Sequence, residues 1–177
     1  PIRAHGIEQG LTVPAVNALA QDAYGLVWAG TESGLFRFDG RSWHDVDVRL
    51  PSPFVNALLT DRKGRMWVAT RAGVAVLEPL APGQATLARG VPATIISHLG
   101  EDPAGQVWVL GPAGPMRQDP EGTFVLDPGW PAGQTAQALF ACPESPEVLA
   151  ACGAAVLSKR PQEAGWQVDP LPLPAYP

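Results

Sequence analysis

One short phrase recurs three times in this chain, at intervals of about forty residues. Residues 22–40 read DAYGLVWAGTESGLFRFDG, residues 61–79 read DRKGRMWVATRAGVAVLEP, and residues 102–120 read DPAGQVWVLGPAGPMRQDP. A fixed period of this length indicates a repeat architecture in which every copy is one supersecondary unit. Four positions stay in step, and they hold Asp22, Asp61 and Asp102; Gly25, Gly64 and Gly105; Trp28, Trp67 and Trp108; and Gly34, Gly73 and Gly114.

The sequence pattern of each copy predicts short antiparallel strands separated by tight turns. In the first copy, VNALAQD (16–22) is an apolar strand and LVWAGT (26–31) is its partner across the turn DAYG. In such a turn Asp caps backbone amides and Gly takes a positive φ. A third strand follows in GLFRFDG (34–40), and the alternating RSWHDVDV (41–48) gives a fourth. Four antiparallel strands in about forty residues are typical of a β-propeller blade.

The recurring Asp, Gly and Trp positions are expected to be structural. Stacked blades leave a wedge between neighbouring sheets, and one indole ring there buries about 150–250 Å². We therefore assign these landmarks to turns and to packing between blades, and look elsewhere for a ligand site.

A fourth, degenerate copy follows in TAQALFACPESPEVLAACGAAVLSKR (135–160). With a residue or two inserted in its turn, Cys142 falls near the Asp position and Leu149 at the Trp position, while Trp166 resembles Trp43 of the first copy. The predicted fold is therefore all-β, with about four four-stranded antiparallel blades. Their expected spans are residues 11–49, 50–89, 90–129 and 130–171, and residues 2–7 are expected to be the outer strand of a preceding blade.

Composition and charge narrow the function classes. The net charge of −5 comes without a basic stripe, which argues against binding to nucleic acid or to an anionic membrane. The apolar content of 46% is too high for a disordered chain. No apolar run approaches the roughly 18 residues of a membrane span.

A search for catalytic or metal-binding sets leads to a negative prediction. His5, His44 and His98 fall at different blade positions without the spacing of a metal site, so neither metal nor cofactor is expected. Asp45 and Asp47 are two residues apart and so lie on the same face of one strand. We expect this face to be exposed to solvent, so the two carboxylates are not assigned to acid–base catalysis.

Cys142 and Cys152 are predicted to be two free, mostly buried thiols. In the repeat register about four residues at ~3.3 Å each separate their strand positions. That is beyond the Cα separation of about 7 Å that a disulfide spans.

Propeller geometry supplies the candidate ligand site. Ligands usually meet the face where the links between blades and the turns between second and third strands surround the central channel. Alignment predicts one small polar residue per blade at this mouth, with three charged or titratable neighbours: Asn17, Asn56, Ser97 and Gln137, beside Glu32, Arg71 and His98. Such a ring suits a small polar ligand such as a sugar or a peptide. The alternative is that these side chains bond to the backbone or to channel water.

The segment IEQGL…VNALAQDAYGLVWAGTESGLFRFDG resembles the two-component regulator propeller repeat, found in extracytoplasmic sensor regions of bacterial hybrid histidine kinases and some diguanylate cyclases. The resemblance implies a complete ring of seven or eight blades, of which this chain has about half. It further implies a periplasmic or extracytoplasmic sensory and ligand-binding module for signal transduction, not itself an enzyme, with a downstream kinase or cyclase domain. The alternatives are a virginiamycin-lyase-like propeller enzyme and a plain protein-interaction scaffold.

Open blade faces are a liability, so we expect self-association. A homodimer that completes an eight-bladed ring is preferred to a truncated fragment with open ends or a compact four-bladed closure.

Overall fold

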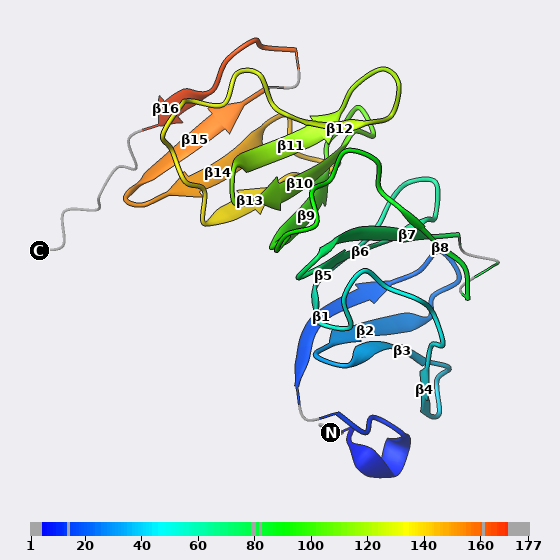
Figure 1. Cartoon of the computed structure of the whole chain (residues 1–177). Coiled ribbons are helices and arrows are strands. Elements are labelled where there is room, and N and C mark those ends of the chain that lie inside the picture. Colours follow the sequence, from blue (N-terminus) through cyan, green and yellow to red (C-terminus); the bar gives the residue numbers. More distant parts are fainter. Residues whose placement is uncertain (1–4, 14, 79–80, 82, 161, 170–177) are drawn as a thin grey trace, which may run out of the picture. The chain divides into compact units, whose positions relative to one another are not determined.

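A computed structural model describes residues 5–13, 15–78, 81, 83–160 and 162–169. These residues form four sheets, each of four strands in sequential order, and every pairing is antiparallel (Figure 1). The only helix among them is the short 3₁₀ helix η1 (Ile7–Gln9), and no helix in this part of the chain has the length and apolar character to span a bilayer. The prediction of an all-β fold with four four-stranded antiparallel blades is confirmed.

Each sheet lies inside the span expected for one blade. Blade 1 contains β1 (Val16–Gln21), β2 (Val27–Thr31), β3 (Gly34–Phe38) and β4 (Trp43–Asp45). Blade 2 contains β5 (Val55–Thr60), β6 (Met66–Thr70), β7 (Gly73–Leu77) and β8 (Ala85–Leu87). Blade 3 contains β9 (His98–Glu101), β10 (Val107–Gly111), β11 (Gly114–Gln118) and β12 (Phe124–Leu126). Blade 4 contains β13 (Ala138–Phe140), β14 (Val148–Cys152), β15 (Ala155–Lys159) and β16 (Gln167–Asp169).

The chain divides into two compact units. Unit 1 covers residues 1–97 and holds blades 1 and 2, while unit 2 covers residues 98–177 and holds blades 3 and 4. Within each unit the two blades pack against each other through apolar side chains.

The segment before blade 1 differs from the sequence expectation. Residues 2–7 are predicted as an outer strand; residues 2–4 lie outside the described residues, and no strand forms over residues 5–7. The backbone N–H of Gly6 instead donates to the side-chain oxygen of Gln9 (2.8 Å), which caps η1. A strand also needs a neighbour with which to pair, and no described strand pairs with this segment.

The landmark Asp makes one set of hydrogen bonds in blades 1 to 3. In blade 3, Oδ1 of Asp102 accepts from the backbone N–H groups of Ala104 (2.9 Å) and Gln106 (3.0 Å). Its Oδ2 accepts from the indole Nε1 of Trp108 (2.9 Å). The corresponding Asp–Trp bonds in blades 1 and 2 are both 2.8 Å long. One carboxylate therefore closes the hairpin turn and fixes the indole ring.

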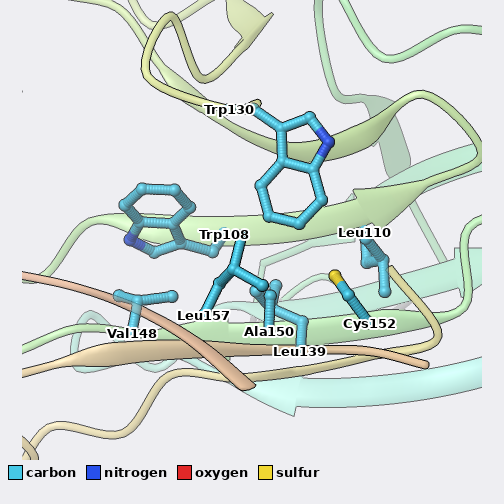
Figure 2. Close-up of a cluster of buried hydrophobic side chains, with 8 residues drawn as sticks. All are labelled: Trp108, Leu110, Trp130, Leu139, Val148, Ala150, Cys152 and Leu157. Atoms are coloured by element: carbon cyan, nitrogen blue, oxygen red, sulfur yellow. The ribbon is translucent and has the colours of Figure 1, made fainter. Parts of the chain in front are cut away.

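The fixed indole packs on the following blade. Trp108 is 1% exposed and lies with Trp130 against side chains of β14 and β15, among them Val148, Ala150 and Leu157 (Figure 2). In unit 1, Trp28 joins a cluster with residues of β5, β6 and β7. Burial of about 200 Å² of indole surface contributes up to about 5 kcal/mol at each contact.

Blade 4 keeps the register of the repeat while changing its residues. The N–H of Ser145 donates to the carbonyl of Cys142 (3.0 Å), the bond that Gly105 makes to Asp102 in blade 3. Leu149 pairs across the hairpin with Phe140, as Trp108 pairs with Gly100. Leu149 therefore holds the Trp position, as the sequence predicts. The aromatic residue of this cross-strand pair is Phe140, which lies in the first strand of the blade instead of the second.

Asp102→Ala is expected to lower the free energy of unfolding by about 2–4 kcal/mol, because two turn amides and a buried indole N–H lose their acceptor. Trp108→Phe keeps an aromatic ring at this position but removes the indole N–H donor. In a double-mutant cycle measured by urea unfolding, the two changes should couple by about 1–2 kcal/mol.

Asp119 supplies the matched control for this cycle. Its Oδ1 also accepts from two turn amides, those of Glu121 and Thr123, both at 2.9 Å, but it binds no indole. Asp119→Ala should therefore combine additively with Trp108→Phe. Additivity in the Asp102 cycle would contradict the shared bond.

Candidate functional site

The predicted mouth residues lie at one end of their blades, where the first strand begins. In blade 1, Val16 at the start of β1 pairs with Thr31 at the end of β2, so the turn that contains Glu32 lies beside Asn17. In blade 2, Val55 pairs with Thr70 in the same way. This places Arg71 beside Asn56 at the equivalent end.

Asn17 and Asn56 link the first strand of each blade to the next segment of chain. Both stand at register shifts, between Val16 and Ala18 in β1 and between Val55 and Ala57 in β5. A bulge re-aims the side chain that it contains. The Nδ2 of Asn17 donates to the carbonyl of Val55 (3.0 Å), and that of Asn56 donates to the carbonyl of Ile96 (2.9 Å).

These bonds use only one half of each amide group. The N–H side of Asn17 and of Asn56 satisfies a backbone carbonyl, as in the alternative considered from the sequence. Their side-chain oxygens accept no hydrogen bond from a described residue. Acceptor capacity therefore remains at this end of unit 1.

Glu32 and Arg71 add opposite charges at the same end. Both side chains are exposed, and neither forms an ion pair with a residue that the structure describes. The guanidinium of Arg71 lies 3.4 Å from the ring centroid of Phe54, and its backbone N–H donates to the Phe54 carbonyl (3.2 Å). The aromatic face holds the cation and leaves its N–H donors at the edge of the stack.

In unit 2, His98 and Gln137 occupy the corresponding end of blades 3 and 4. His98 opens β9 and is half-buried, and burial lowers the pKa of its ring below the ordinary value. The Oε1 of Gln137 accepts from the N–H of Gly153 (3.1 Å) in the turn after β14. Ser97 is half-buried and follows Ile96 at the end of unit 1. The structure thus brings Asn17, Glu32, Asn56 and Arg71 to one end of unit 1, and His98 and Gln137 to one end of unit 2.

Four surface hollows have none of these residues in their linings, but two of them adjoin the mouth end of blade 1. One of about 630 Å³ includes Val16, next to Asn17, and another includes Ser33, next to Glu32. The hollow beside Ser33 has a volume of about 380 Å³ and extends along Gly34, Asp45 and Asp47. Asp45 and Asp47 are exposed at its edge. One of about 430 Å³ in unit 2 runs beside Pro103, Glu144 and Arg160, among others. A channel mouth is enclosed by all the blades around it, so the two blades of a unit supply only part of its wall.

The histidines outside the mouth have structural surroundings. The ring of His5 packs edge-on against Phe38, with centroids 5.0 Å apart. The Nε2 of His44 lies 2.8 Å from Oδ2 of Asp39, an exposed pair at the turn between β3 and β4, which is the opposite end of blade 1 from the mouth. Hydrogen bonds from the backbone of Ser42 and Arg41, and then from His44, hold the pKa of Asp39 well below its ordinary range. No group of three His, Cys, Asp or Glu residues placed to hold a metal ion occurs in the described part of the chain.

Cys142 and Cys152 are free thiols, as predicted. Cys152 is buried, and its burial raises the pKa of the thiol. Cys142 is half-buried in the turn before β14, where its Sγ donates to a carboxylate oxygen of Glu144 (2.7 Å).

Comparison with known proteins identifies the repeat. Residues 49–72, which include β5 and most of β6, match the family model described as "Two component regulator propeller". The segment is similar to a two-component regulator propeller repeat. The resemblance inferred from the sequence is thereby confirmed. A search of curated proteins finds no significant match.

Solved structures share the blade architecture of this propeller chain. An extracellular domain assigned to the hybrid two component system BT3049 of B. thetaiotaomicron has a TM-score of 0.77 at 19% identity, over 94% of this chain and 26% of its own. That of BT4673 from the same organism has a TM-score of 0.56 at 14% identity, over 93% of this chain and 32% of its own. Virginiamycin B lyase from Staphylococcus aureus has a TM-score of 0.69 at 13% identity, over 90% of this chain and 56% of its own. The propeller chain therefore spans a third or less of the two extracellular domains, and the likeness shows the fold.

A buried ion cluster joins the two propeller blades of unit 2, and the sequence did not predict it. Asp127, which follows β12, is 1% exposed. Its Oδ1 accepts from Nζ of Lys159 (2.6 Å) and from Nε1 of Trp166 (3.1 Å), both in blade 4. Its Oδ2 accepts from Nε of Arg117 (2.7 Å) in its own blade.

The equivalent positions in unit 1 are apolar. The backbone N–H of Val46 donates to Leu35, as that of Asp127 donates to Pro115, so Val46 holds the Asp127 position. Leu77 pairs with Met66 at the start of β6, as Lys159 pairs with Val148 at the start of β14. Val46 and Leu77 belong to one apolar cluster. An ion pair in one unit thus replaces an apolar contact in the other.

Asp127→Asn is expected to lower the free energy of unfolding by about 3–5 kcal/mol, because the buried Lys159 loses its counter-charge. The double variant Asp127→Val with Lys159→Leu copies the apolar pair of unit 1 and should recover most of that loss. Urea unfolding at neutral pH measures both. A double variant less stable than Asp127→Asn would contradict the equivalence of the two contacts.

Unfolding at acidic pH provides a second test of the Asp127–Lys159 contact. Burial would raise the pKa of Asp127, but hydrogen bonds from Lys159 and Arg117 outweigh it, and the pKa lies below its ordinary value of 3.8. The stabilisation is therefore present above that value and is lost as pH falls through the folded-state pKa. The double variant should lose less stability than the natural chain below pH ~4.

Proposed function

We propose that this chain is part of the sensory propeller of an extracytoplasmic signal-transduction protein. It binds a small polar ligand at the mouth end of its blades, has no catalysis of its own, and acts on a downstream kinase or cyclase domain. The repeat at residues 49–72 and the fold shared with extracellular domains assigned to hybrid two component systems support this proposal.

The observation that carries the proposal is the group of polar side chains at the mouth end of unit 1. Glu32 and Arg71 present opposite charges there without an ionic partner among the described residues. Asn17 and Asn56 present amide oxygens whose N–H₂ groups are already committed to the backbone. Fixed acceptors beside one acid and one base form a site for a ligand that both donates and accepts hydrogen bonds.

The chemistry of these groups points to sugars or short peptides. A carboxylate and two amide oxygens accept from hydroxyl or amine donors, while a guanidinium held flat on Phe54 donates to hydroxyl or carboxylate oxygens. The stacking also limits the rotamer entropy that Arg71 would lose on binding.

The same asparagines suggest how binding reaches the rest of the molecule. A ligand shifts a conformational equilibrium only by its different affinity for two arrangements. Because the amides of Asn17 and Asn56 bond to Val55 and Ile96, a ligand on their oxygens acts on groups that link successive segments. The packing of neighbouring blades is then the element that the ligand biases.

A catalytic role has less support. Virginiamycin B lyase shares the fold at 13% identity. A likeness at this identity gives no reason to assign the lyase reaction to this chain. The His44–Asp39 pair lies at the far end of blade 1 from the mouth, in an exposed turn. At the mouth, His98 is the histidine that a lyase-like reaction would require.

The proposal predicts that a member of a panel of mono- and oligosaccharides and di- and tripeptides raises the thermal midpoint of the chain. By calorimetry, Arg71→Ala and Glu32→Gln should each weaken binding of that compound about tenfold or more, equal to about 1.4 kcal/mol.

Arg41→Ala and Glu121→Gln are the matched controls, since both residues are exposed and lie in turns away from the mouth end. They should leave affinity unchanged. The proposed ligand class is wrong if no compound binds at millimolar concentration, and the site is wrong if the controls weaken binding as much as the mouth variants.

A further inference from the structure

The hollow beside Ser33 adjoins both charges of the mouth end of unit 1. Ser33 directly follows Glu32, and Pro53, which also lines the hollow, directly precedes Phe54. The ring of Phe54 holds the guanidinium of Arg71. The whole lining belongs to unit 1, and its volume of about 380 Å³ falls in the usual range for small-molecule sites, about 300–1,000 Å³. A ligand at the mouth end therefore has this hollow beside it.

The link from blade 1 to blade 2 forms one wall of the hollow, and its side chains alternate between charged and apolar. The apolar ones pack against the core cluster of unit 1: Val46, Val48 and Leu50. The charged ones are exposed: Asp45, Asp47 and Arg49. All six residues line the hollow. It therefore combines apolar lining residues with a few charged groups, as ligand sites do.

The charged groups of this wall have no partner among the described residues. The carboxylates of Asp45 and Asp47 accept no hydrogen bond and form no ion pair there, and the guanidinium of Arg49 is equally unpaired. Asp45 and Asp47 are two residues apart, about 6.6 Å along an extended chain, and on the same side of it. Two carboxylates with unused acceptor capacity thus face the same region.

The repeat shows that the fold does not require these two carboxylates. The same register positions of blades 2 and 3 hold other residues: Leu87 and Leu126 in place of Asp45, and Arg89 and Pro128 in place of Asp47. Both of those blades form the same four-stranded sheet. The acidic pair is therefore a property of blade 1 that blade architecture does not explain.

We propose that this hollow is a subsite for the amino terminus of a short peptide, whose ammonium group binds Asp45 and Asp47. The inference rests on the proposed function, and it selects peptides from the two ligand classes named there. An ammonium group has a positive charge and several N–H donors, so it can donate to both carboxylates. A neutral sugar has no charge with which to offset them.

The other features of the hollow agree with a peptide. Its carboxyl terminus matches the guanidinium of Arg71, which donates to carboxylate oxygens. The apolar lining residues, which include Leu35 and Val46, suit small aliphatic side chains such as that of alanine. A divalent metal ion needs more oxygen ligands than two carboxylates supply, and the described residues contain no metal-binding group of three acidic or related side chains.

Calorimetry with tri-L-alanine and its N-acetyl derivative tests the proposal. Acetylation removes the positive charge and keeps the carboxylate, so it should weaken binding to the natural chain about tenfold or more. Asp45→Asn and Asp47→Asn should each weaken binding of tri-L-alanine about fivefold or more, and should leave the affinity for the acetylated peptide unchanged. Because both carboxylates are exposed and make no bond to a described residue, the thermal midpoint of the free chain should not change.

Glu121→Gln is the matched control. It also removes one exposed negative charge, but from a turn in unit 2 that does not line the hollow. Its affinity for tri-L-alanine should equal that of the natural chain. An equal loss in this variant would overturn the assignment, because the effect would then come from net charge.

Maltotriose, a neutral ligand, separates failure of this inference from failure of the proposed function. If maltotriose binds and Arg71→Ala weakens it while tri-L-alanine does not bind, the mouth site stands and the peptide subsite is overturned. If tri-L-alanine binds through Arg71 but tolerates both asparagine variants, the mouth site again stands and the hollow is not the subsite. Equal affinity for the free and the acetylated peptide also overturns the inference.

Discussion

The hydrogen bond from a buried indole to a turn aspartate is the interaction on which the rest of this structure depends. The carboxylate of Asp22, Asp61 or Asp102 holds two backbone amides of its own hairpin and the Nε1 of a Trp six residues later. Turn and ring orientation are thereby fixed by one group. Trp28 and Trp108, held in this orientation, provide the apolar surface on which the next blade of their unit packs. In blade 4, Cys142 replaces the Asp and Leu149 replaces the Trp. Because both partners are absent together, neither a buried donor nor a buried acceptor is left unpaired.

Polar contacts between neighbouring blades are of two kinds, asparagine bonds to the backbone and a buried ion pair. Each Asn at a first-strand bulge bonds to the backbone of the next segment, whereas Asp127 and Lys159 form an ion pair at a position that is apolar in unit 1. The repeat therefore tolerates different chemistry at one contact as long as the sheets keep their separation. The asparagines use only their nitrogens in this role. Their oxygens stay at the mouth end, so the residues that join blades keep acceptor oxygens there.

The candidate ligand site lies at the end of the strands, where Glu32 and Arg71 occupy turns. Packing of a blade against its neighbour sets the spacing of the turns at its end. In the proposed function, a ligand at these turns would therefore act through the packing of neighbouring blades.

The sequence by itself determined the period, the four strands of each blade, the turn role of Asp and Gly, the place of Leu149 and the free state of the two thiols. These features depend on alternation and on bonds within about six residues, which a repeating pattern records directly. Only the tertiary structure decided the bonds from Asn17 to Val55, 38 residues away, and from Asp127 to Lys159, 32 residues away. It also decided that residues 5–7, the described part of an expected strand, lead into the 3₁₀ helix η1. Such contacts depend on how one sheet is placed against the next, and the pattern within a single sheet carries no information about that placement.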